Sequence, residues 1–390
     1  MPEYPAGRKL TAAEQPADAI PIYRPRLPSA DALRPYLELL DHTRWYSNHG
    51  QLERQLAARL SRLLGSVEPI IGTACSGTAA LTGAILARAG RASAARPLCL
   101  CPGYTFVATA GAIEQCGYVL HLVDVDAASW ALDPATLMAH PELSRAGLVV
   151  PVAPYGRAIA QEPWRRFENL TGVPVVIDGA AGFERLEDDP TSHIGPIPVA
   201  LSFHATKVFA TGEGGAIVTT GSALLLRSIQ ALNFGFMGAR RSDIAGTNGK
   251  MSEYHAAVGL AELDGWFRKR ADFAKIAGLY RECAARHGLG PRLITAPTIA
   301  SCYVLYEAAS LAEARAVKAA LAEDAIEYRH WYGLGLHREP YFAAAGGDPL
   351  PSVEALAPRL IGLPVAPDLT PASIARIVAV IANVAKRVCA

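Results

Sequence analysis

The sequence predicts an α/β fold in which a mostly parallel sheet is flanked by helices, with a smaller C-terminal α+β domain. The first observation is periodic: from about residue 68 to residue 219, short apolar runs alternate with amphipathic segments. Strands that alternate with helices in this order pair in parallel and are covered on both faces. The second observation is that the polar and glycine-containing motifs follow these apolar runs. Ligands in such sheets bind at the carboxyl ends of the strands.

Three segments are expected along the chain. Residues 1–30 are rich in proline and predict an extended N-terminal arm. Residues 31–265 predict a large, ligand-binding domain, and residues 266–390 predict a small C-terminal domain. In order, the expected elements are helices over 31–40 and 52–64, a strand near 70, a helix from 77, a strand over 97–101, a helix from about 105, strands over 118–123 and 147–152, a helix near 162–170, strands over 174–177, 200–203 and 216–219, a long helix or helix pair over 251–286, a strand over 302–306, and helices over 311–321 and 371–387.

The composition indicates a folded protein with balanced surface charge. Hydrophobic residues make up 51% and charged residues 19% of the 390 residues, and the formal net charge is +1. A disordered chain and a nucleic-acid-binding surface are therefore excluded as interpretations. No apolar run approaches the ~20 residues of a membrane span, and the first residues lack the apolar core of a signal peptide. Neither a membrane nor nucleic acid is an expected partner.

The seven cysteines predict a reduced, cytoplasmic protein, because their number is odd and most lie in apolar runs. Cys99 and Cys101 stand two residues apart, which invites a metal-binding interpretation. Their place in an apolar run favours a buried strand instead, so no metal is expected.

Lys207 follows the apolar run at 199–201, and the glycine-rich turn Gly212–Gly215 comes shortly after it. A lysine in this position can form a Schiff base with an aldehyde cofactor. Ser202, five residues earlier, can hydrogen-bond a phosphate on the same cofactor. These two roles are what a pyridoxal phosphate enzyme requires, and pyridoxal 5'-phosphate is the cofactor that we expect. Once the amino group is exchanged, the free lysine amine would move a proton between the substrate carbon and the cofactor carbon.

Gly77 and Thr78 are predicted to open a helix directly after a strand. The free N–H groups and the positive end of the helix dipole bind phosphate well at such a place. The structural alternative is an ordinary helix start, with Ser76 or Thr78 as the capping residue. The presence of Ser202 and Lys207 in the same chain favours the phosphate site.

Asp178 ends the apolar run at 175–177. A carboxylate there could pair with a protonated pyridine nitrogen, and that charge makes the ring an electron sink when the α-proton of the substrate is removed. The alternative is a turn aspartate that accepts local N–H groups. An aromatic ring at the start of the helix that follows the strand over 97–101, Tyr104 or Phe106, could stack on the cofactor. A core aromatic is the alternative for either residue.

Together these motifs resemble the DegT/DnrJ/StrS sugar aminotransferases, a family of fold-type I pyridoxal phosphate enzymes. The similarity is strongest at residues 202–207 and 211–218, and it extends in the family's order over roughly residues 20–385. Further matching segments are residues 45–48, 75–81, 102–109, 233–236, 246–253 and 363–369.

The resemblance implies a role for each matching residue. Lys207 is similar to the Schiff-base lysine and Asp178 to the partner of the pyridine nitrogen. Asn248 is similar to an asparagine that reaches the phosphate from the neighbouring subunit, which implies a homodimer with a shared site. The positions similar to the family's phosphate-binding residues are Gly77, Thr78 and Ser202, and Phe106 is similar to the aromatic residue that stacks on the ring. The expected substrate-binding residues are Tyr46, Asn48, His330, Trp331 and Tyr332.

Two features depart from the family pattern. Ala181 stands three residues after Asp178, where the family usually carries a histidine or glutamine that contacts the cofactor. Gly333 and Gly335 follow the aromatic substrate segment, and an unusual substrate choice is therefore expected. Some relatives replace the lysine with histidine and become dehydratases, and Lys207 argues against that branch.

Three hypotheses about function follow. The first is a transaminase that moves an amino group from glutamate to a nucleotide-linked keto-deoxysugar, with residues 45–48 favouring sugar C4 over C3. The second is a transaminase on a cyclitol ketone or another non-nucleotide carbonyl, which would use the same cofactor residues. The third belongs to another class: a ligand-binding or regulatory protein of this fold without turnover, for which Ala181 is the only support. A nicotinamide dehydrogenase is discounted, because residues 72–77 lack the Gly-x-Gly-x-x-Gly spacing.

Overall fold

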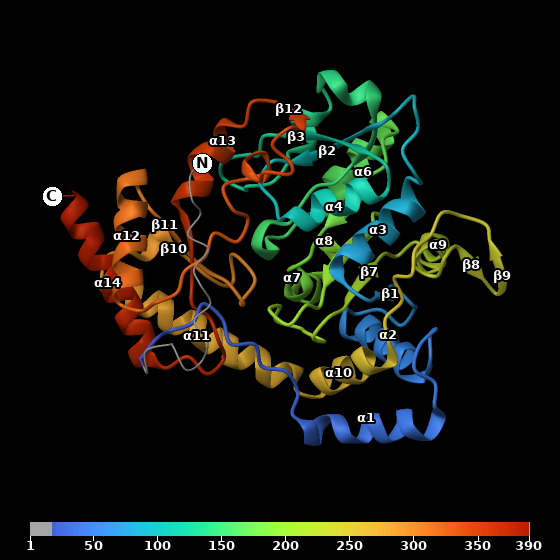
Figure 1. Cartoon of the computed structure of the whole chain (residues 1–390), viewed down its shortest axis with the longest axis horizontal. Coiled ribbons are helices and arrows are strands. Elements are labelled where there is room, and N and C mark those ends of the chain that lie inside the picture. The colour runs from blue at the N-terminus through green and yellow to red at the C-terminus, as the bar shows by residue number, and fades with distance from the viewer. Residues whose placement is uncertain (1–17, 390) are drawn as a thin grey trace.

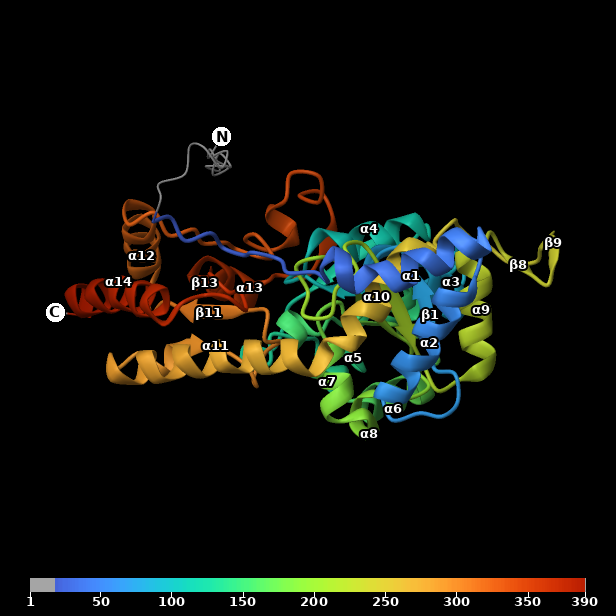
Figure 2. The ribbon, with the colours of Figure 1, turned by 90° about the horizontal axis from the view of Figure 1, so that it is seen from below.

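The computed structural model describes residues 18–389 and shows two parts joined by a long helix (Figure 1). Residues 1–17 of the predicted arm lie outside the described residues. The joining helix is α11 (Trp266–Arg286), which follows α10 (Glu253–Asp264) after one residue, so the predicted helix pair is present. In both views α11 runs from the larger part to the smaller one (Figure 2).

The larger part is built on one sheet. Its strand order is β1-β7-β6-β5 continued by β4-β2-β3-β12, and single bridges from Val149 to Val175 and from Val152 to Asp178 connect the two halves. β7 is antiparallel to both of its neighbours, while the other pairs are parallel. This confirms the predicted mostly parallel sheet. The strands are β1 (Ile71–Ala74), β2 (Leu98–Pro102), β3 (Val119–Val123), β4 (Ala146–Val149), β5 (Ile177–Asp178), β6 (Val199–Ser202), β7 (Gly215–Val218) and β12 (Gly346–Gly347).

Helices cover both faces of this sheet, which is why its strands are apolar at consecutive positions. On β6, Val199 and Leu201 belong to one buried cluster and Ala200 belongs to the other. The helices of this part are α1 (Ala30–Thr43), α2 (Gln51–Leu63), α3 (Gly77–Arg88), α4 (Val107–Gln115), α5 (Pro134–Leu137), α6 (Gln161–Thr171), α7 (Phe183–Asp188), α8 (Pro190–His193), α9 (Ser222–Leu232) and α10.

A small hairpin follows α9 and projects away from the sheet at its β1 edge (Figures 1 and 2). Its strands are β8 (Phe236–Met237) and β9 (Ala239–Ser242). Phe234 and Met237 are exposed large hydrophobic side chains in this region. This region therefore presents apolar surface that residues 18–389 leave uncovered.

The smaller part contains an antiparallel sheet of order β10-β11-β13. The sequence predicted one strand here, over 302–306. β11 begins later, because Ser301 is held in a turn where its N–H and hydroxyl both donate to the carboxylate of Glu184 at 2.8 and 2.7 Å. The remaining elements are β10 (Leu293–Ile294), β11 (Val304–Glu307), α12 (Leu311–Glu323), α13 (Pro351–Leu356), β13 (Leu360–Leu363) and α14 (Pro371–Cys389).

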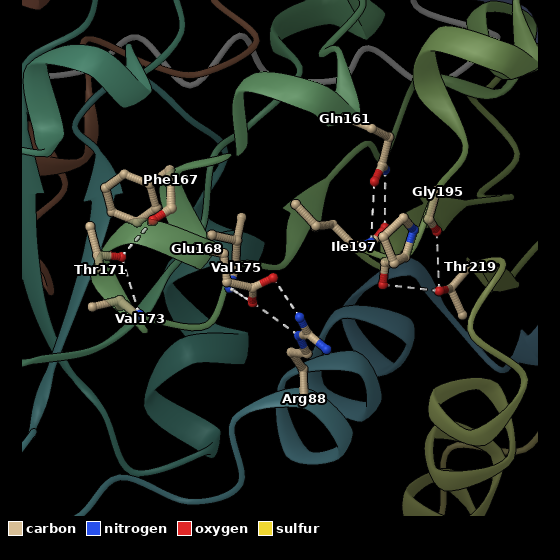
Figure 3. Close-up of polar contacts among 11 residues, drawn as sticks. Arg88, Gln161, Phe167, Glu168, Thr171, Val173, Val175, Gly195, Ile197 and Thr219 are labelled. Carbon is tan, nitrogen blue, oxygen red and sulfur yellow. Dashed lines mark hydrogen bonds and ion pairs between the residues drawn. The ribbon is translucent and has the colours of Figure 1, made fainter. Parts of the chain in front are cut away.

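Partly and fully buried polar contacts fix the helices and strands that carry the site (Figure 3). Arg88, at the end of α3, pairs with Glu168 of α6, and its Nε donates to the carboxylate at 3.0 Å. The same carboxylate accepts the N–H of Val175 at 3.0 Å, just before β5. The side-chain amide of Gln161 bonds both the N–H and the carbonyl of Ile197 before β6. These contacts thus hold together the carboxyl end of α3 and the amino ends of β5 and β6, opposite the ends that carry the site.

Asp348, which follows β12, connects this C-terminal segment to the large sheet near its β3–β12 edge. His121 on β3 and His140 each lie against one of its carboxylate oxygens, at 3.1 and 2.9 Å. Among residues 18–389 these three side chains also have the spacing of metal ligands. However, Nδ1 of His140 accepts the N–H of Glu142 at 3.2 Å, which places the ring proton on Nε2, facing Asp348. The cluster is therefore a hydrogen-bonded clamp.

Among the helices of residues 18–389, none combines the length and the apolar composition that a membrane crossing requires.

Candidate active site

Lys207 lies in a tight turn at the carboxyl end of β6. The turn is closed by the N–H of Lys207, which donates to the carbonyl of His204 at 2.8 Å, and by Ala205, whose N–H donates to Gly212 at 2.8 Å. Gly212 has a φ of +86°, a conformation that favours glycine. The ε-amino group of Lys207 donates to the hydroxyl of Tyr303 at 2.9 Å. The glycine-rich turn thus aims Lys207 at the region between the two parts.

Asp178 lies at the carboxyl end of β5 and is buried. Its Oδ2 accepts the hydroxyl of Thr109 at 2.7 Å and its Oδ1 accepts the N–H of Ala180 at 3.0 Å. Because the hydroxyl of Thr109 donates its only proton to Asp178, the hydroxyl of Thr105 must donate to Thr109 across their 2.7 Å contact. Burial raises the pKa of Asp178, while the bonds from Thr109 and Ala180 and the charge of Lys207 lower it, with a net rise. A buried carboxylate of this kind calls for a cationic partner.

Gly77 opens α3 directly against Ser202. A methyl group at Gly77 would lie 2.6 Å from Cβ of Ser202, so only glycine permits this approach. Ser76 caps the helix, and its hydroxyl accepts the N–H of Ala79 at 3.1 Å. The first N–H groups of α3 and the hydroxyl of Ser202 are thereby gathered at the positive end of a 12-residue helix, where phosphate binds well.

The two candidate aromatic residues have different surroundings. Tyr104 is buried, and its hydroxyl lies 2.8 Å from the hydroxyl of Tyr155. Phe106 is the N-cap residue of α4 and is 53% exposed. Tyr104 is therefore a core residue, and Phe106 stays the predicted stacking residue.

The predicted substrate segment is split by the fold. The ring of Trp331 packs edge-on against Tyr303 with centroids 5.3 Å apart. Tyr332 stacks on Tyr155 at 4.6 Å, and its hydroxyl accepts the N–H of Tyr155 at 3.0 Å. His330 instead lies against Lys318 of α12, with Nε2 3.3 Å from Nζ. The structure brings Trp331 and Tyr332 to the Lys207 side and leaves His330 packed within the smaller part.

Tyr46, Asn48 and Asn248 lie on the surface of the single chain. Tyr46 stacks on Tyr254, with ring centroids 6.0 Å apart, and both rings are exposed. The side-chain oxygen of Asn248 accepts a hydrogen bond from Lys250 at 2.7 Å. The roles predicted for these three residues stay predictions.

Sequence reasoning missed two residues of this site. Thr109, which orients Asp178, lies in the first turn of α4, four residues after Thr105; a helix from about residue 105, as the sequence predicted, would place both hydroxyls on one face. That signal was available. Tyr303 is 96 positions from Lys207 in the chain, and no local pattern connects the two.

His330 offers a test of the fold through pH. Burial, followed by the charge of Lys318, lowers the pKa of His330 to about 4. Above pH 6.5 the imidazole is neutral in both states, but between pH 6.5 and about 4 the unfolded chain takes up a proton that the folded chain does not. This group therefore removes about 3 kcal/mol of the free energy of unfolding across that pH window.

We expect His330→Phe to abolish this part of the loss of stability when chemical unfolding is measured at pH 7, 5.5 and 4.5. The variant His42→Phe, at an exposed site, should show the same loss as the wild type. An unchanged pH slope in His330→Phe would contradict the burial of this ring.

A lysine, a buried carboxylate and a helix N-terminus at the carboxyl ends of a mostly parallel sheet define a class of protein, the pyridoxal phosphate-dependent transferases. Residues 30–382 match the sequence profile of the DegT/DnrJ/EryC1/StrS aminotransferase family. The chain belongs to this family and is a pyridoxal phosphate-dependent aminotransferase.

Similar proteins cover most of the chain. Protein Rv3402c of Mycobacterium tuberculosis (strain ATCC 25618 / H37Rv) is 32% identical over 391 residues, covering 96% of this chain and 92% of the relative. The dTDP-4-amino-4,6-dideoxy-D-glucose transaminase of Shigella dysenteriae is 34% identical over 247 residues, covering 62% and 64%. The crystal structure of DesI in the presence of its TDP-sugar product has a TM-score of 0.82 and 28% identity, covering 95% of this chain and 94% of that one.

The residues present fit pyridoxal phosphate. Gly77 and Ser202, which approach each other closely, would hold the phosphate, and the buried carboxylate of Asp178 would pair with the ring nitrogen. When bound, the cofactor supplies a cationic conjugated ring that takes up the electron pair left when a substrate proton is removed. Lys207 would attach the cofactor and would serve as the base and acid at its Nζ.

Proposed function

We propose that this aminotransferase moves an amino group from glutamate to a nucleotide-linked keto-deoxysugar, with sugar C4 favoured over C3. The observation that carries the proposal is the pairing of Lys207 and Asp178 at neighbouring strand ends, where their charges interact, within a family of sugar aminotransferases. The name of the Shigella dysenteriae relative, a transaminase of a 4-amino sugar nucleotide, supports the choice of C4.

The proposal includes a homodimer whose site is completed by the neighbouring subunit. Tyr46 stacks on Tyr254, and these two rings and the neighbouring Trp45 are between 44% and 51% exposed. Phe234, just before the β8–β9 hairpin, and Met237 within it are exposed as well. Exposed aromatic groups of this kind mark protein interfaces. Asn248 would reach the partner's phosphate from this side. A mass near twice 41.3 kDa in sedimentation equilibrium is expected, and a monomer that turns over substrate would contradict the shared site.

The substrate class is tested by competition among ketones. The full-length protein with pyridoxal phosphate and ¹⁵N-glutamate is given equal concentrations of a nucleotide-linked 4-keto-6-deoxyhexose, its 3-keto isomer and a cyclitol ketone. We expect ¹⁵N to appear by mass spectrometry first in the 4-keto sugar, at least about tenfold faster than in the cyclitol, because each missing buried contact costs ~1–3 kcal/mol.

Each other outcome identifies a different function. Faster amination of the 3-keto isomer would move the reaction to C3. Faster amination of the cyclitol would support the non-nucleotide alternative. A visible absorbance band that no amino donor bleaches would support the binding protein without turnover.

A further inference from the structure

The ε-amino group of Lys207 has one direct partner among residues 18–389, the hydroxyl of Tyr303. The two atoms are 2.9 Å apart, and Nζ also lies 5.6 Å from the centroid of the same ring. Asp178 acts on Lys207 through its charge but shares no hydrogen bond with it in the described part of the chain. The immediate surroundings of the reacting nitrogen are therefore set by one tyrosine.

Tyr303 is fixed in place by its neighbours. The side chain is only 6% exposed, and its ring packs edge-on against Tyr155 at 5.4 Å and Trp331 at 5.3 Å. Packing of this kind holds the phenol oxygen at one position. The loop before β11 is held in turn by the two bonds from Ser301 to Glu184.

The phenol stays neutral. Burial, with smaller contributions from Cys302 and Asp178, holds the pKa of Tyr303 well above its usual value. A neutral phenol has one proton to give and two lone pairs, so it accepts from the ammonium form of Lys207 and donates to the amine form. Ala180 and Ala181, which follow Asp178, carry only methyl groups and offer Lys207 no hydrogen-bonding side chain.

We propose that Tyr303 is a catalytic partner of Lys207: its phenol oxygen holds the ε-amino group in place and stabilises the ammonium form after Lys207 has taken a proton. The inference rests on the proposed function of Lys207 as base and acid. Tyr303 exchanges no proton itself. The proton leaves the substrate carbon, binds Nζ and returns to another carbon, while the O–H bond of Tyr303 stays intact.

The first test reads the lysine without turnover. In the cofactor-free, full-length protein, acylation of Lys207 is followed against pH by mass spectrometry of its peptide. A hydrogen bond to a charged group is stronger than one to a neutral group, so Tyr303→Phe should lower the midpoint of labelling by about one pH unit. Tyr155→Phe removes a phenol from the same aromatic wall, but one that bonds Tyr104, and should leave the midpoint in place. Equal midpoints in wild type and Tyr303→Phe would overturn the proposal.

The second test uses the holoenzyme. Tyr303→Phe should lower kcat by about 10- to 100-fold, with KM for the sugar changed by less than about threefold, because the loss concerns the proton-moving group. A change in KM alone would overturn the proposal in favour of a substrate contact. If Tyr303→Phe does not fold, 3-fluorotyrosine at position 303 keeps the ring and weakens the oxygen as an acceptor, and the labelling midpoint must again fall.

The two tests separate the inference from the proposed function. If no ketone is aminated by the wild type while the labelling midpoint falls as expected, the contact stands and the proposed substrate is wrong. If the wild type turns over and the midpoint does not move, the function stands and the role of Tyr303 is wrong.

Discussion

Replacement of Lys207 with alanine is expected to abolish amino transfer, lowering kcat by at least about 10⁴-fold. In the proposed mechanism Lys207 both attaches the cofactor and moves the proton, and general acid–base catalysis alone contributes about 10²–10⁴-fold. The fold should survive, because Lys207 lies in a loop and its side chain makes one hydrogen bond, to Tyr303. The loss of such a bond costs about 0.5–1.5 kcal/mol. Steady-state kinetics and thermal melting measure the two effects.

Lys275 on α11 is the matched control for this variant, because it is an exposed lysine far from the strand ends. Lys275→Ala should retain wild-type kcat. If Lys207→Ala kept more than a few per cent of wild-type turnover, Lys207 would not be the attachment point and base.

Replacement of Asp178 with asparagine is expected to slow turnover by about 10²–10⁴-fold, because the ring nitrogen loses the charge that keeps it protonated. The variant should still fold. The new carbonyl oxygen can accept the N–H of Ala180, and the new amide can donate to Thr109 once Thr109 turns its proton toward Thr105. Both contacts at this side chain, of 2.7 and 3.0 Å, are thus kept, and only the contact with Thr109 exchanges its donor and acceptor.

A second variant separates charge from orientation at this residue. Thr109→Val removes the hydroxyl that holds Asp178 and keeps the charge, so we expect a loss of only about tenfold in kcat, the value of one hydrogen bond. Single-turnover rates of the half-reaction with glutamate measure both variants. Equal rates for Asp178→Asn and wild type would show that Asp178 is a turn residue only.

The sequence predicted the sheet and the groups at its strand ends because both depend on short stretches of chain. Consecutive apolar residues such as those at 199–201 indicate strands buried on both faces. The carboxyl ends of such strands meet at one edge, so Asp178 and Lys207 were expected near each other. The approach of Gly77 to Ser202 follows from the same geometry, since the helix after β1 begins at that edge.

What the sequence did not predict depends on contacts between distant segments. The insertion of β7 antiparallel between β1 and β6 has no local signal, and neither does the return of Gly346–Gly347 to the edge of the large sheet. His330 and Trp331 are adjacent in sequence but face different parts of the molecule, because packing against Lys318 decides the side of His330. Tyr303 reaches Lys207 only through the placement of the smaller part. We retain as a proposal the boundary between a large and a small domain at residues 265 and 266. β12 lies after this boundary in the sequence but pairs with β3 in the sheet of the large domain.

Reductive trapping tests the central claim most directly. The full-length protein is saturated with pyridoxal phosphate, reduced with borohydride, digested and analysed by mass spectrometry. The account predicts a pyridoxyl adduct on Lys207 and no adduct there in Lys207→Ala. An unmodified Lys207 peptide from cofactor-saturated protein, or an adduct on another lysine, would contradict it.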